Sequence, residues 1–296
     1  MTILKKNFIE ISDNLKKYRP NFILCYIDMK LNNIVIRFHN WVKQNKDFLD
    51  SVRKYNPIFN RYRTPQHSIC NQPEKIQTRI ASRDINHKIL NGDGIYNEVT
   101  YQRCSIGFPA RNNDLFCFVT AGHCSNETKR RDIEIFLHFP WDSNQTYAEL
   151  GRMVESEYID EYDFGLIKIG ENTTKLISTR IRNTDSDYAE LNVDGGKILT
   201  SHGAHACKSG LMTHVTCGYV KGINTISANE VSGIYEDKVY FGKDDYEIGC
   251  AGDSGGTLFF LFTNFIKCEY KWHIQWRLRR SLFLLLILVN CLYSIK

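Results

Sequence analysis

The feature that most constrains the fold is a series of short β-rich runs that begins near residue 91. Runs such as FCFVTA, IEIFLHF, DFGLIKI and HVTCGYVKGINTI are separated by clusters of Gly, Asn and Asp. Helical periodicity largely disappears from this part of the chain. Short strands at close spacing, with turn residues between them, are typical of antiparallel barrels and sandwiches. We therefore predict an all-β barrel or sandwich for this region.

The first part of the chain has a different pattern. The run FILCYIDMKLNNIVIRF (22–38) predicts two strands around a turn at Asn32 and Asn33. Residues 40–55 have the spacing of an amphipathic helix. The apolar side of that helix comprises Trp41, Phe48, Val52 and Tyr55. Residues 60–90 are polar, and they predict a linker or a cleavable joint.

The net charge of +5 hides a strong asymmetry along the chain. Residues 1–90 carry a net +10, and residues 91–257 carry a net −10. A basic segment can indicate nucleic-acid binding, but basic and aromatic residues are not interleaved here, so we expect no nucleic-acid partner. The charges instead suggest two segments of one chain that dock on each other, because complementary fields favour correct pairing.

The ten cysteines favour export from the cell. None of them has C-x-x-C spacing, so we expect no metal site, and disulfides in an oxidising compartment fit better. The first residues lack a clear apolar signal-peptide core. We nevertheless expect a secreted or extracellular protein. Nothing in the sequence implies a cofactor.

The stretch GCAGDSGG (249–256) surrounds Ser254 with glycine. Such a cluster indicates a backbone that turns tightly or approaches another group closely. One structure with that need is an oxyanion hole, where peptide N–H groups point at a developing negative charge. If Ser254 is a nucleophile, a base and a group that orients the base must lie elsewhere in the chain.

Two other runs supply candidates for these groups. In FVTAGHC a β-rich run ends in two small residues before His123, although His123 could also be a structural histidine beside a half-cystine. In EYDFGLIKI, Asp163 precedes an apolar strand and could orient an imidazole. The alternative is an Asp that caps a strand in a turn, with Asp160 and Glu161 as competitors for the role.

The chain order His123, Asp163, Ser254 is that of the chymotrypsin-type double barrel. With TAGHC and GDSGG both present, the chain resembles the chymotrypsin-like (trypsin-fold) serine endopeptidases. It looks most like the branch of α-lytic protease and the streptogrisins. The resemblance implies an all-β double six-stranded antiparallel barrel that hydrolyses peptide bonds through an acyl-enzyme. Ser254 would attack, His123 would transfer protons, Asp163 would orient His123, and the N–H groups of Gly252 and Ser254 would stabilise the oxyanion.

Further stretches carry the closer resemblance. CSIGFPARNNDLFCFVTAGHC and CKSGLMTHVTCGYV each match a cysteine loop of that branch. The disulfides that they imply are Cys104–Cys124 and Cys207–Cys217. YIDMKLNNIVIRF resembles the last part of the family's pro-segment, and ILNGDGIY (89–96) resembles the junction where the mature enzyme begins.

The resemblance implies a division of the chain. Residues 1–90 would be a small α+β pro-segment and linker, and residues 91–258 would be the protease domain. The partners implied are a polypeptide substrate and the chain's own pro-segment, in a zymogen that is otherwise a monomer. The alternative is that residues 1–90 form an independent domain.

Residues 259–296 are a hydrophobic and basic tail that matches none of the strands with which the family closes its second barrel. The tail therefore predicts an open barrel with an unpaired sheet edge. Cys250 would lose its family partner, with Cys268 as a substitute. The apolar run at 281–295 is shorter than the roughly 20 residues of a membrane-spanning helix, so it only weakly suggests an anchor. The alternative function is an inactive or truncated trypsin-like domain that acts in binding or membrane anchoring.

Ile248 lies six residues before Ser254, where the family places the base of the primary pocket. An apolar base offers no partner for a basic substrate side chain, which would be desolvated without a counter-charge. We therefore expect apolar or small residues before the cleaved bond. If the loop is shifted by one residue, Glu247 would supply a charge instead.

Overall fold

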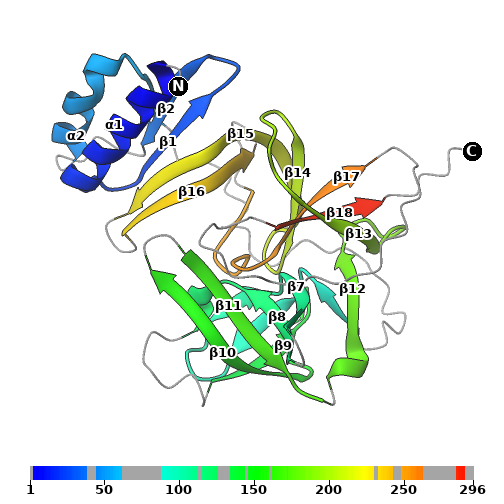
Figure 1. Cartoon of the computed structure of the whole chain (residues 1–296). Helices are drawn as coiled ribbons and strands as arrows, with labels where there is room; N and C mark the ends of the chain where they lie inside the picture. Colours follow the sequence, from blue (N-terminus) through cyan, green and yellow to red (C-terminus); the bar gives the residue numbers. More distant parts are fainter. Residues whose placement is uncertain are drawn as a thin grey trace, which may run out of the picture.

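The computed structural model folds into two β-sheets, with its two α-helices at the N-terminal end (Figure 1). The residues that it describes are 3–38, 45–61, 88–112, 115–125, 134–143, 146–159, 162–171, 173–229, 233–242, 248–262 and 285–290. Within these residues, no helix is both long and apolar enough to cross a membrane.

The first sheet has seven strands in the order β6-β5-β9-β10-β11-β8-β7. All of its neighbouring strands are antiparallel. Its core includes the fully buried side chains of Phe118, Phe136 and Ile167. The strands are β5 Gly94–Asn97, β6 Arg103–Ser105, β7 Phe108–Asn112, β8 Leu115–Thr120, β9 Ile135–Phe139, β10 Glu149–Ile159 and β11 Tyr162–Ile169.

The second sheet has eleven strands, in the order β3-β2-β1-β15-β14-β17-β18-β13-β12-β4, with β16 paired to β15. Both sheets together confirm the prediction of an all-β fold beyond residue 91. The strands are β1 Ile23–Asp28, β2 Asn33–Phe38, β3 Ile58–Arg61, β4 Ile89–Asn91, β12 Ile177–Arg182, β13 Glu190–Ile198, β14 His205–Gly210, β15 His214–Asn229, β16 Gly233–Gly242, β17 Thr257–Phe262 and β18 Leu285–Asn290.

Strands β17 and β18 continue the fold past residue 258, where the expected protease domain ends. β17 runs to Phe262, and β18 is antiparallel to β13 and parallel to β17. The sequence did not predict a strand at β18, because residues 259–296 match none of the family's closing strands. The run LLILV nevertheless has the apolar, partly β-branched composition that favours a buried strand.

The N-terminal region confirms the predicted hairpin and adds a helix. β1 pairs with β2 from Ile23 opposite Phe38 to Asp28 opposite Asn33, so the turn comprises residues 29–32, and Asn33, which was expected in the turn, is the first residue of β2. Of the expected helix at 40–55, the structure describes α2 (Lys46–Val52) and the 3₁₀ turn η2 (Arg53–Tyr55), while Trp41 lies outside the described residues. The helix α1 (Ile3–Tyr18) was not predicted, although its inner side has helical spacing. That side comprises Leu4, Phe8, Ile11 and Leu15.

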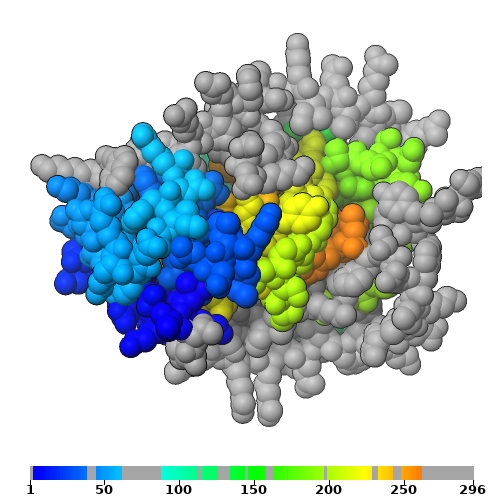
Figure 2. All heavy atoms as spheres, turned by 90° about the horizontal axis from the view of Figure 1, so that it is seen from above, coloured from blue at the N-terminus to red at the C-terminus, as the bar shows by residue number. Residues whose placement is uncertain are grey.

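The N-terminal region joins the second sheet through β1. This strand is antiparallel to β15, with Leu24 opposite Ser227 and Cys25 opposite Ile226. Ile226 is also part of the core beneath α1 and α2. Glu236 of β16 accepts a hydrogen bond from the Ser12 hydroxyl (2.8 Å) and pairs with Lys16. The blue N-terminal region therefore abuts the yellow β15 and β16 in Figure 2.

A buried carboxylate connects the two sheets. Asp93 follows β4 and has no exposed surface. It accepts hydrogen bonds from the guanidinium of Arg182 on β12 and faces the ring of His138 on β9 at 3.0 Å. Burial alone would raise the pKa of Asp93, but Arg182 and His138 outweigh it and hold the pKa below its usual range. Asp93 therefore links the end of β4 in the second sheet to β9 of the first sheet.

Candidate active site

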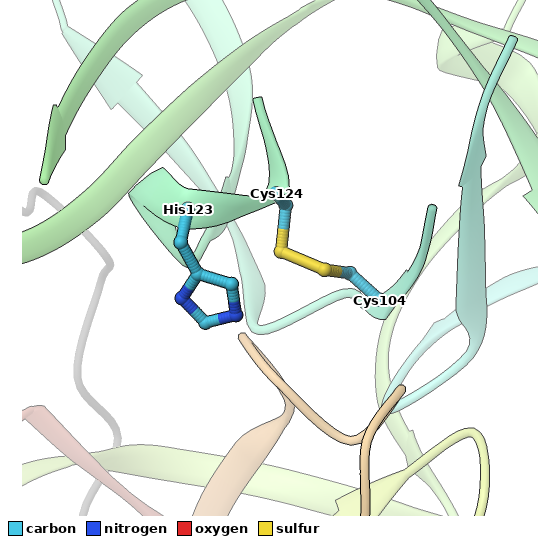
Figure 3. A group of neighbouring side chains, drawn as sticks. All are labelled: Cys104, His123 and Cys124. Atoms are coloured by element: carbon cyan, nitrogen blue, oxygen red, sulfur yellow. A yellow bond between two sulfur atoms is a disulfide. The ribbon is translucent and has the colours of Figure 1, made fainter. Parts of the chain in front are cut away.

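His123 lies at the end of a strand of the first sheet. β8 ends at Thr120, Ala121 is extended, and a 3₁₀ turn, η4 (Gly122–Cys124), follows. The next residue, Cys124, is disulfide-bonded to Cys104 in β6. Figure 3 shows the ring of His123 beside this disulfide and directed toward the loop that contains Ser254. The disulfide thus holds the corner from which the imidazole projects.

Asp163 comes from the neighbouring strand. β11 is antiparallel to β8, with Gly165 opposite Thr120, and this register brings Asp163 next to His123. Nδ1 of His123 lies 2.6 Å from Oδ2 of Asp163, and the backbone N–H of His123 donates to Oδ1 at 2.9 Å. About three tenths of each side chain is exposed. Burial by itself raises the pKa of Asp163, but the hydrogen bonds from His123 outweigh it and lower the pKa.

The competing residues Asp160 and Glu161 lie outside the described residues. Among the described residues, the carboxylate that meets the imidazole is that of Asp163. The structure therefore brings two of the three expected residues into direct contact.

Ser254 lies in a loop between Cys250 and β17, and the glycines of this loop have the close approaches that the sequence suggested. Gly252 has φ +102°, and a Cβ there would lie 2.5 Å from Cγ of Met212. A Cβ on Gly255 would lie 2.7 Å from the backbone nitrogen of Ala121, two residues before His123. The loop of Ser254 therefore packs on the corner that carries the imidazole.

Among the described residues, the expected oxyanion donors of this loop have no hydrogen-bond acceptor. Neither the N–H of Gly252 nor that of Ser254 donates a hydrogen bond to another described residue. The Ser254 hydroxyl likewise makes no hydrogen bond to His123 within the described part of the chain. Two peptide N–H groups beside a partly exposed serine are the arrangement that could bind an oxyanion.

Asp253 holds the loop of Ser254 in place through partners that the sequence did not predict. Its carboxylate lies 3.0 Å from Nζ of Lys208 on β14, with little of either side chain exposed. It also accepts hydrogen bonds from the backbone N–H groups of Cys250, Met212 and Thr213. Burial raises the pKa of Asp253, but Lys208 and these donors outweigh it, so the pKa is lowered. The only signal in the sequence was the position of an acidic residue directly before the serine.

The structure contains both implied disulfides, Cys104–Cys124 and Cys207–Cys217. Cys250 is also disulfide-bonded, whereas Cys268 lies outside the described residues. A histidine lies close to each of the first two disulfides. Because these sulfur atoms are bonded to each other, they offer no thiolate to a metal ion.

Ile248 lies at the start of the segment that leads to Ser254. Its carbonyl accepts a hydrogen bond from the Thr216 hydroxyl (2.5 Å), and its side chain is near Gly242, at 3.8 Å from where a Cβ would be. Glu247, the alternative pocket residue, lies outside the described residues. The pocket assignment of Ile248 stays a prediction.

Two curated proteins are similar to part of this chain. "Serine protease 1" of Streptomyces fradiae is 28% identical over 173 residues, which cover 58% of this chain and 42% of that protein. Streptogrisin-D of Streptomyces griseus is 27% identical over 177 residues, which cover 58% of this chain and 38% of that protein. The chain thus spans less than half the length of these relatives.

Solved structures of bacterial proteases are also similar. Thermobifida fusca Protease A is 22% identical and has a TM-score of 0.43, over 58% of this chain and 77% of that one. Nocardiopsis protease has the same identity and TM-score, over 58% of this chain and 78% of that one. The sequence model of the family described as trypsin matches residues 107–266, more than half of the chain. The chain therefore belongs to the trypsin family.

Proposed function

We propose that the protein is a serine endopeptidase that hydrolyses peptide bonds through an acyl-enzyme. The observation that carries the proposal is the hydrogen-bonded pair of His123 and Asp163, at the corner on which the loop of Ser254 packs. Ser254 is the nucleophile, and His123 removes its proton and returns it to the leaving amine. Asp163 holds the imidazole in one tautomer and stabilises its charged form.

The N–H groups of Gly252 and Ser254 stabilise the oxyanion of the tetrahedral intermediate. Their support is that neither group is used by another described residue. Two such donors lower the barrier because they point at charge that develops only during the reaction. The reaction, so described, is carried by side chains and peptide groups of this chain.

The N-terminal region acts as a pro-segment that is released by cleavage near residues 86–92, where ILNGDGIY (89–96) resembles the junction at which the family's mature enzyme begins. The helices and the hairpin of this region form a core with β15. Lys16 also pairs with Glu236 of β16, in the acidic part of the chain (91–257). The Asp253 carboxylate is already paired with the Lys208 cation. Its charge therefore does not need to be neutralised by the new amino terminus that cleavage creates. The protein acts on polypeptides outside the cell as a monomer, which fits its disulfides.

A fluorophosphonate probe tests the nucleophile. We expect the full chain to be labelled at Ser254, and Ser254→Ala to lose labelling entirely while it keeps its thermal unfolding temperature. Peptide mapping identifies the labelled residue. Ser51→Ala is the control, because Ser51 donates to a helix carbonyl in the N-terminal region and should leave labelling unchanged.

Labelling that persists in Ser254→Ala would reject Ser254 as the nucleophile. A folded wild-type chain that remains unlabelled, before and after separation of the N-terminal region, would favour the alternative of an inactive trypsin-like domain.

A further inference from the structure

Ser105, the last residue of β6, meets the loop of Ser254 from the first sheet. The side chain is fully buried. Its hydroxyl donates to the carbonyl of Gly252 (2.8 Å) and accepts from the N–H of Leu211 (2.9 Å). Its backbone N–H donates to the carbonyl of Ser254 (2.7 Å). Ser105 therefore binds the carbonyls of Gly252 and Ser254, the two residues whose N–H groups donate to no other described residue.

The carbonyls of residues 252–254 all accept hydrogen bonds. The Gly252 and Ser254 carbonyls accept from Ser105, and the Asp253 carbonyl accepts from the N–H of Gly256 at 3.0 Å. In a trans peptide the carbonyl and the N–H point in opposite directions. The peptide that carries the Asp253 carbonyl and the Ser254 N–H is thus oriented with its N–H away from these contacts.

The hydroxyl of Ser105 has no further hydrogen to donate. A hydroxyl has one hydrogen to donate, and that hydrogen goes to Gly252, while a lone pair accepts from Leu211. Leu211 begins the turn whose Met212 and Thr213 N–H groups bind Asp253. The hydroxyl therefore links the first sheet to the Gly252 carbonyl and to the turn at residues 211–213 that binds Asp253.

We propose that Ser105 is a positioning residue, whose hydroxyl holds the 252–254 backbone in the orientation that presents two N–H groups to the oxyanion. The inference rests on the proposed function and adds a residue that the triad pattern does not contain. Ser105 touches no reacting atom in this role. Its loss should therefore slow acylation and leave binding of the ground state nearly unchanged.

The burst of 4-nitrophenolate from 4-nitrophenyl acetate measures acylation directly. The dependence of the burst rate on ester concentration separates the acylation rate constant from ester binding. Outright loss of one oxyanion donor costs about 10²–10³ in kcat, so a donor that is kept but held less well should cost about tenfold to a hundredfold. We expect Ser105→Ala, in the full chain, to lower the acylation rate constant by this factor with unchanged half-saturation.

The pair Ser105→Thr and Ser105→Val isolates the hydroxyl, because the two side chains have nearly the same shape. We expect the Thr variant to acylate about tenfold faster than the Val variant at equal folded fraction. Ser209→Ala is the matched control, since this fully buried hydroxyl donates to the Arg182 carbonyl instead (2.8 Å). Its acylation rate constant should stay within about twofold of wild type.

Equal acylation by the Thr and Val variants, or an equal loss in Ser209→Ala, would overturn the inference. So would a loss that only follows the folded fraction, as a purely structural role requires. Failure of the proposed function looks different, because the wild-type chain would then show no burst and no fluorophosphonate label at Ser254.

Discussion

The two halves of the candidate active site are built in different ways. His123 and Asp163 come from the paired strands β8 and β11, so the register of one sheet places them. The loop of Ser254 is instead held by groups that are far apart in the chain, including Ser105 from the first sheet and Lys208 from the second. The first half is therefore a product of local strand pairing, and the second depends on contacts between the sheets.

This difference separates chemistry from stability. A change in the first half can remove a function without disturbing the backbone, because the strand ladder remains. A change in the second half removes a buried partner, and a buried group without its partner destabilises the fold. Substitutions in the two halves should therefore differ in whether activity and stability fall together.

The largest expected effect is in the first half. Asp163→Asn keeps the size of the side chain but removes the charge that orients and stabilises the His123 imidazole. We expect the acylation rate to fall by about 10⁴-fold. The unfolding temperature should change little, since both strands remain paired. Stopped-flow acylation and thermal unfolding measure the two quantities.

Glu157→Gln on β10 is the matched control, because it makes the same chemical change at an exposed residue opposite Phe164 of the same strand pair. Activity in this control should be that of wild type. If Asp163→Asn loses stability in proportion to activity, the first half is not fixed by strand register alone.

The second effect tests the other half. Lys208→Met removes the cation from the buried Asp253 carboxylate, whose side chain is 5% exposed. Breaking a buried pair from one side costs about 3–5 kcal/mol. We expect the free energy of unfolding to fall by that amount, as measured by urea titration. Arg180→Met, which breaks the exposed pair with Glu190, should cost less than about 1 kcal/mol.

Acid titration sharpens the same test. The folded pKa of Asp253 lies below its unfolded value of about 3.9, so its contribution to stability is present above about pH 4. That contribution is lost as the pH falls through the folded pKa. Without Lys208 the folded pKa rises, so acid unfolding of Lys208→Met should begin at a higher pH than in wild type. Identical acid transitions would mean that the pair does not hold the loop.

The sequence predicted the two halves unequally for the same physical reason. The β-rich runs and the motifs around His123 and Ser254 are local, and they were sufficient for the fold class and for the His123–Asp163 contact. The contacts of Ser105 with Gly252 and of Lys208 with Asp253 were not predicted, because neither Ser105 nor Lys208 belongs to the catalytic motifs that indicated the His123–Asp163 contact. The strand β18 was not predicted, because the tail that contains it does not match the strands with which the family closes its second barrel.

The smallest expected effect concerns the N-terminal region, which pairs with the second sheet through β1 and β15. Weakening this contact should loosen the N-terminal region and leave the first half of the site, on β8 and β11, unchanged. Glu236→Gln removes the charge that binds Lys16 (2.8 Å) and weakens the bond from Ser12. The Lys16 side chain is half exposed and that of Glu236 a quarter exposed, so solvent screens the pair and the loss should be about 0.5–1 kcal/mol.

Hydrogen exchange at constant pH measures this loss locally. We expect Glu236→Gln to speed amide exchange severalfold in α1 and β1, with no change in β8 and β11. Asp50→Asn is the control, because Asp50 pairs with Arg53 inside the N-terminal region and makes no contact across β15. The pKa of Glu236 is lowered, because Lys16 and Ser12 outweigh the effect of burial. The contribution of Glu236 to stability is therefore present above about pH 4.3. It is lost as the pH falls through the folded pKa. Faster exchange in β8 and β11 as well would show that both halves of the site respond to the N-terminal region. The two halves would then differ in the contacts that build them but not in their stability.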